Sequence, residues 1–127
     1  MVPSSNRAAL TALMQSQRAM EDRTRTLGHS PVEVLEVGED VLAFAAREDE
    51  AFASLTDLID PAVRAELAAE HQHLAEDLDL LAWLLRTSPD SPDVEVLAEA
   101  LARRMRQHLE RDGRLLARTK QLLTPHS

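Results

Sequence analysis

Four residues with metal-binding side chains interrupt apolar residues that repeat at helical spacing. They are Glu48, His71, His108 and Asp112. His108 and Asp112 are four residues apart, so a helix places both side chains on one face. Two imidazoles and two carboxylates that face one another form a ligand set suited to iron, manganese or zinc.

A metal-free polar cluster is the alternative interpretation of the same residues. A buried carboxylate without a partner is costly, so each one needs either a hydrogen-bonded histidine or a cation. In the metal-free cluster His71 would pair with Glu48. In the same way, His108 would pair with Asp112. The sequence leaves both interpretations open.

The other histidines have weaker claims to a functional role. His73 lies two residues from His71, about 200° around a helix, so we expect it to face solvent. Glu70 and His73 match the Glu-x-x-His motif of ferritin-like di-iron bundles, but the chain lacks the second copy that such a site needs. His29 and His126 lie outside the helical segments and have no neighbouring ligands.

The elements that must position these residues are four helical segments bounded by proline, glycine and serine. Their expected bounds are about 6–27, 31–59, 61–86 and 92–123. The pairs Ser30-Pro31, Asp60-Pro61 and Ser91-Pro92 each place an N-cap residue before a proline at the first helical position. Two finer expectations concern the first loop. Glu33 should complete a capping box with Ser30, and Gly28 suits a left-handed residue after a helix end.

The predicted fold class is all-α. Alanine and leucine dominate the chain, whereas valine, isoleucine and aromatic residues, which favour strands, are scarce. Short connections force neighbouring helices to run antiparallel, so we expect an antiparallel up-down-up-down four-helix bundle. Its length of 127 residues suits a single domain.

Core-facing positions in such a bundle alternate three and four residues apart. In the last segment these positions are Leu97, Leu101, Met105, His108, Asp112, Leu115, Thr119 and Leu122. His71 and His108 lie near the middle of their segments, as does Gln17, and Glu48 lies slightly past the middle of its own. Antiparallel packing should therefore bring these polar residues to the same height in the core.

With these motifs in hand, the chain resembles the hemerythrin-like, or HHE cation-binding, family of four-helix bundles. EHQHL at residues 70–74 is similar to the family's Glu-His element, and QHLERDGRLL at residues 107–116 is similar to its His-x-x-x-acid-acid element. REDEAFASL at residues 47–55 is similar to the acidic stretch that follows the family's second histidine. The order and spacing of these elements agree over nearly the whole chain.

The ligand set of this chain is incomplete compared with that family. Phe44 stands at one expected histidine position, either Gln17 or Met14 stands at another, and Gly113 replaces an acid. The resemblance implies that the remaining ligands bind one non-haem metal ion, iron first among the candidates. These ligands are Glu48, His71, His108 and Asp112. Whether Gln17 replaces a ligand stays open.

The implied function is metal, oxygen or redox sensing or storage. The alternative is a metal-free descendant of the same fold that acts as a protein-interaction module or dimeric scaffold. An enzyme has little support, because the sequence offers no nucleophile-base pair and no phosphate-binding loop.

Charge and hydropathy exclude two classes of partner. The chain has 14 basic and 22 acidic residues, a net charge of -8, which disfavours binding to nucleic acid or to anionic lipid. No stretch approaches the roughly 20 apolar residues of a membrane span, and the N-terminus lacks the apolar run of a signal peptide. We therefore expect a cytoplasmic protein.

Two surfaces could bind a protein partner. The stretch LDLLAWLL at residues 78–85 is apolar on nearly every side, so a lone bundle should leave Leu80, Trp83 or Leu84 exposed. This pattern favours a homodimer through the C-terminal end of the third helix, with a wider core contact as the alternative. Half of the basic residues lie in the last segment, where they form either a solvated face or a surface for a regulatory partner.

Overall fold

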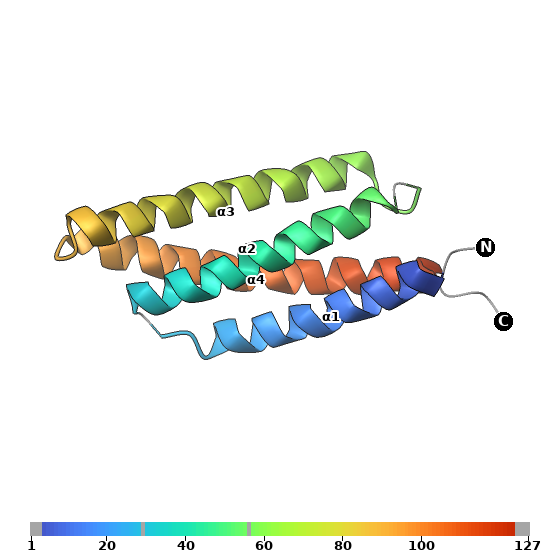
Figure 1. The fold of residues 1–127 in the computed structure, drawn as a ribbon, viewed down its shortest axis with the longest axis horizontal. Coiled ribbons are helices and arrows are strands. Elements are labelled where there is room, and N and C mark those ends of the chain that lie inside the picture. The colour runs from blue at the N-terminus through green and yellow to red at the C-terminus, as the bar shows by residue number, and fades with distance from the viewer. Residues whose placement is uncertain (1–3, 29, 56, 124–127) are drawn as a thin grey trace.

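The structure is a computed structural model that describes residues 4–28, 30–55 and 57–123. This part of the chain forms four α-helices and no strand, which confirms the all-α class and the number of helices (Figure 1). The helices are α1 Ser4–Arg25, α2 Pro31–Ala53, α3 Pro61–Thr87 and α4 Pro92–Leu123.

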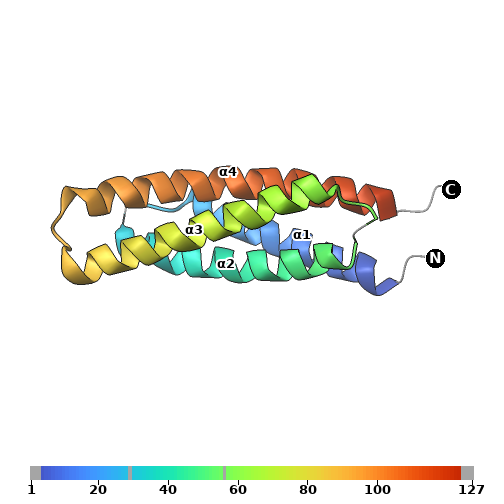
Figure 2. The ribbon, with the colours of Figure 1, turned by 90° about the horizontal axis from the view of Figure 1, so that it is seen from above.

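The four helices lie side by side around one apolar core. Figures 1 and 2 show the start of α1 and the end of α4 at one end of the molecule, together with the α2–α3 connection. The α1–α2 and α3–α4 connections lie at the other end. Contacts join α1 to α2 and α4, and α3 to the same two helices. Contacts also join α2 to α4 across the core, and these two helices carry three of the four candidate ligands.

Side chains of the residues before the three prolines cap the helices as expected. Asp60 Oδ1 accepts a hydrogen bond from Ala62 N at 2.8 Å, and Ser91 Oγ accepts one from Asp93 N at 3.2 Å. Ser30 Oγ accepts one from Glu33 N at 3.5 Å.

The two finer expectations for the first loop are wrong. The carboxylate of Glu33 accepts from Gly28 N at 3.5 Å, so it does not return to Ser30 as a capping box requires. No described glycine has a positive φ, so Gly28 is not a left-handed residue.

The second helix ends earlier than predicted. It ends at Ala53 rather than near residue 59, and Ser54 N and Ser54 Oγ both donate to Ala51 O and close the last turn. Leu55 and Ile59 are nevertheless buried, so the apolar pattern predicted their burial but not their conformation. The first helix begins and ends about two residues before its predicted bounds.

The core-facing positions of α4 follow a true helical period. Leu122 is 62% exposed and Leu123 is buried, and Leu116 is more buried than its predicted neighbour Leu115. The expected three-four alternation repeats every 3.5 residues, whereas a straight helix has 3.6 residues per turn. The error therefore accumulates by about 20° per heptad along this long helix. His108 and Asp112, near the middle of α4, are buried as predicted.

Gly38 in α2 allows α3 to approach closely. A Cβ at this position would overlap Leu78, with Leu78 Cδ1 only 2.8 Å away. A glycine weakens a helix by about 1 kcal/mol relative to alanine, and here it makes room for a buried leucine. No helix in the described part of the chain is long and apolar enough to cross a membrane.

Candidate metal centre

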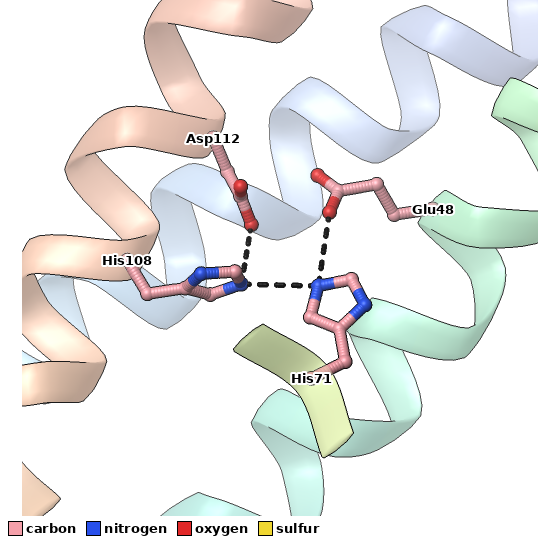
Figure 3. A group of neighbouring side chains, drawn as sticks. All are labelled: Glu48, His71, His108 and Asp112. Atoms are coloured by element: carbon pink, nitrogen blue, oxygen red, sulfur yellow. Dashed lines mark hydrogen bonds and ion pairs between the residues drawn. The ribbon is translucent and has the colours of Figure 1, made fainter. Parts of the chain in front are cut away.

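The four predicted ligands come together in the middle of the core (Figure 3). Glu48 comes from α2, His71 from α3, and His108 and Asp112 from α4. Glu48 and Asp112 are fully buried, and the two histidines are less than 10% exposed. Helical spacing thus placed each residue on the inner face of its helix, and packing brought the three helices together at this height.

One nitrogen of each imidazole faces the centre of the cluster. His71 Nε2 lies 3.1 Å from His108 Nε2, and the two rings meet edge to face. His71 Nε2 lies 3.5 Å from Glu48 Oε1, and His108 Nε2 lies 2.9 Å from Asp112 Oδ2. Each residue therefore offers one ligand atom, and these atoms all lie within 4.8 Å of one another.

The two buried carboxylates lack hydrogen bonds. Neither oxygen of Glu48 and neither oxygen of Asp112 has an aligned donor among the described residues. The histidine nitrogens are close to these oxygens, but the geometry is not that of hydrogen bonds. Burying a carboxylate under these conditions costs several kcal/mol unless positive charge compensates it. The centre therefore requires either bound protons or a cation.

A second pair of carboxylates faces the outer nitrogens of the histidines. Asp49 Oδ2 lies 3.0 Å from His71 Nδ1, and Glu70 Oε2 lies 3.4 Å from His108 Nδ1. Metal-binding histidines commonly donate their outer N–H to a carboxylate, which orients the ring and raises its basicity. With the protons on Nδ1, both Nε2 atoms present lone pairs to the centre.

Sequence reasoning missed the contacts of Asp49 and Glu70 with the histidines. Each residue is the sequence neighbour of a predicted ligand, and this adjacency is the only signal that could have indicated them. Asp49 of α2, however, contacts His71 of α3, and Glu70 of α3 contacts His108 of α4. Only the packing of the helices creates these pairs.

Arg111 holds the outer carboxylate of α3 in place. Its Nη1 lies 3.0 Å from Glu70 Oε1, and its Nη2 lies 2.8 Å from Glu66 Oε2. The guanidinium therefore joins α4 to α3 beside the cluster and leaves Glu70 Oε2 facing His108.

Gln17 is buried in the core, and its side chain forms hydrogen bonds to α1 and α4. Its Nε2 donates to Leu109 O at 2.6 Å and to Glu21 Oε2 at 2.8 Å. A Cβ at Gly113 would lie 2.7 Å from the same nitrogen, so the glycine makes room for this side chain. The amide nitrogen of Gln17 thus ties α1 to α4.

Of the remaining histidines, the structure describes only His73. His73 is exposed, as predicted, whereas His29 and His126 lie outside the described residues.

The pKa values of Glu48, His71 and His108 are all raised above their ordinary values. Burial is the main cause that raises the pKa of Glu48 from 4.5 to about 7. Burial disfavours the charged form of His71, but the contacts and charges of Glu48 and Asp49 outweigh it and raise the pKa to about 9. The pKa of His108 is also raised, because Asp112 outweighs the effect of burial. Without a cation, the centre therefore holds protons that a metal ion must displace.

Comparison of the chain with models of known families, with curated proteins and with solved structures finds no match.

Metal-free protein should lose thermal stability as pH rises from about 6.5 to 9. The raised pKa of His71 adds stability that is complete below 6.5 and is lost as pH passes the folded value of about 9. Glu48 acts in the same direction between pH 4.5 and about 7. Melting curves in chelator should show a fall of several degrees, since 1 kcal/mol corresponds to roughly 4 °C in a domain of this size. A flat or rising curve would contradict the assignment, and His71→Gln should flatten the decline.

Replacement of the outer carboxylate Asp49 should weaken metal binding. Asp49→Asn keeps the shape of the side chain but removes the charge that orients His71, and we expect affinity to fall by about 10-fold to 100-fold. Competition with a coloured chelator measures this change. Glu50→Gln is the matched control, because Glu50 is the next residue, is exposed and is not one of the clustered ligands. Equal affinities for Asp49→Asn and Glu50→Gln would refute the role of Asp49.

Proposed function

We propose that this chain is a hemerythrin-like protein with up-down-up-down topology that binds one non-haem metal ion in its core. The metal is iron, and the protein serves in metal, oxygen or redox sensing or in storage. The observation that carries the proposal is the convergence of two imidazole nitrogens and two buried carboxylates that have no hydrogen bonds of their own.

The spacing of the donor atoms fits a single cation. Ligand atoms about 2.0–2.2 Å from a tetrahedral ion lie roughly 3.4 Å from one another. The three adjacent pairs in the cluster are separated by 3.1, 3.5 and 2.9 Å. All four atoms lie within 4.8 Å of one another, so the side chains would have to draw together for all four to reach bonding distance. Two metal ions would need more bridging ligands than these four residues provide.

The donor types support iron among the possible metals. Imidazole suits iron, zinc and copper, and carboxylate oxygen also accepts iron and manganese. A set of two histidines with carboxylates is typical of non-haem iron sites, in keeping with the hemerythrin-like motifs. Bound iron would supply one-electron redox and oxygen-binding chemistry. The residues of the chain would hold the ion, orient the imidazoles and exclude bulk water.

The test of this proposal is the metal content and melting temperature of parent protein and His108→Leu. Leucine is similar in size to histidine, which limits any cavity effect. Both proteins are produced in iron, manganese and zinc media. The parent should hold one metal ion and melt about 10 °C higher without chelator than with it, the shift expected at a free metal concentration about 100 times Kd. His108→Leu should lack both the metal and the chelator effect.

Gln107→Leu is the matched control, since Gln107 is exposed and adjacent to His108 on the same helix. It should retain the metal and the chelator effect. A parent that stays empty in all three media would reject the proposal and favour a metal-free cluster.

A second candidate function rests on the exposed apolar side chains of α3. Leu80 is 46% exposed and Trp83 is 51% exposed, as expected for a lone bundle, whereas Leu84 packs partly against the core. An exposed tryptophan beside an exposed leucine is a surface that favours protein association. This observation supports a homodimer, and with it a scaffold or interaction module in a cytoplasmic setting.

The double variant Leu80→Lys with Trp83→Glu should convert a dimer to a monomer. Both side chains are exposed, so the substitutions remove apolar contact area between copies without opening the core. Light scattering coupled to size exclusion gives the mass. A parent that is monomeric at high concentration would rule out this dimer.

A further inference from the structure

A pocket of about 440 Å³ between α3 and α4 lies directly beside the metal centre. The ionisable side chains that line it are Glu70, His73, Glu76, Asp77, Arg104 and His108. One of these is a candidate ligand, and another is the outer carboxylate that faces the same ligand. The pocket is therefore continuous with the centre rather than a separate feature of the surface.

The inner wall of the pocket contains donor groups that are shielded from solvent. His108 is only 6% exposed, although the pocket reaches it. Glu70 Oε2 is buried, has no hydrogen-bond partner among the described residues and lies 3.4 Å from His108 Nδ1. Negative charge at the base of the pocket therefore lies next to a candidate ligand, which favours the approach of a cation.

The charge of the pocket selects for cations. Three carboxylates line it against one guanidinium, that of Arg104, which is paired with Asp77. Arg111 pairs with Glu70 from outside the lining, and Glu76 has no ion pair among the described residues, so Glu76 supplies the uncompensated negative charge. The excess of negative charge attracts a divalent cation and repels an anion. The volume also suits a hydrated ion, because six waters at about 30 Å³ each occupy roughly 180 Å³.

The groove on the other side of α3 lacks these properties. It has a volume of about 390 Å³ and is lined by one carboxylate, Asp49, and one guanidinium, Arg64, among apolar residues. No histidine of the cluster lines it. Of the two grooves that flank α3 here, only the one toward α4 combines negative charge with access to a ligand.

We propose that the pocket between α3 and α4 is the loading port through which a hydrated divalent cation reaches the metal centre. This inference rests on the proposed function, since it assumes that the centre binds a metal. The carboxylates of the port concentrate the cation and favour its transfer past His108 into the core.

Stopped-flow measurement of Co²⁺ binding tests the port, because the colour of Co²⁺ reports its coordination. Glu76→Gln removes a negative charge from the port and should slow association by about twofold to threefold at low salt, as expected for one charge acting on a divalent ion. Arg104→Gln removes the positive charge and should accelerate association by a similar factor. Both effects should shrink at 150 mM salt, where charges are screened beyond about 8 Å.

Asp79→Asn is the matched control for these variants. Asp79 is exposed on the same helix, two residues after Asp77 and about 200° away around it, so it does not line the port. Its replacement should leave the rate unchanged, and all variants should bind one Co²⁺ per chain.

Three outcomes would count against the proposal. Parent protein that binds Co²⁺ at a rate indifferent to Glu76→Gln and Arg104→Gln would overturn the port and leave the metal function intact. Asp79→Asn slowing association as much as Glu76→Gln would also overturn it, because the effect would then reflect overall charge. Parent protein that binds no Co²⁺ in an equilibrium titration would overturn the proposed function and the port together.

Discussion

The structure of this bundle depends on how it compensates the charge of two buried carboxylates that have no hydrogen bonds. Glu48 and Asp112 lie at zero exposure in a core of leucine and valine, where an uncompensated negative charge costs several kcal/mol. The raised pKa values of Glu48 and His71 show how the chain meets this demand with protons. A divalent cation would meet it with two positive charges at once, at a point to which both imidazoles direct a nitrogen. Bound protons and a bound cation are thus two alternative ways to compensate the negative charge of the buried carboxylates.

The surroundings of the cluster are arranged in layers that follow from that constraint. The histidines separate the inner carboxylates from an outer pair, Asp49 and Glu70, whose side chains are partly exposed to solvent. Arg111 then balances Glu70 and joins two helices. Exposure to solvent therefore increases from the inner carboxylates through the histidines to the outer carboxylates, and ion pairs between helices connect these layers. These same contacts join the helices, so the buried cluster also contributes to the specificity of packing.

Local signals predicted most of the helix framework. Asp60 and Ser91 cap the helices that they precede, because a side-chain oxygen and a following proline act within a few residues of each other. The end of α2 could not be predicted in the same way. Leu55 and Ile59 continue the apolar pattern, but Ser54 closes the helix before them and both are buried outside the helix. An apolar pattern reports which side chains avoid water, and it does so for more than one backbone conformation.

By itself, the sequence determined which side chains of each helix face the core, and thereby that Glu48, His71, His108 and Asp112 are buried together. Periodicity carries this information because a helix repeats every 3.6 residues and the apolar residues mark the inner face. Only the tertiary structure decided that Asp49 reaches His71, that Glu70 reaches His108, and that a negatively charged pocket opens beside the centre. Those relations join residues of different helices, and they depend on the rotation and separation of helices, which the pattern along a single helix does not encode.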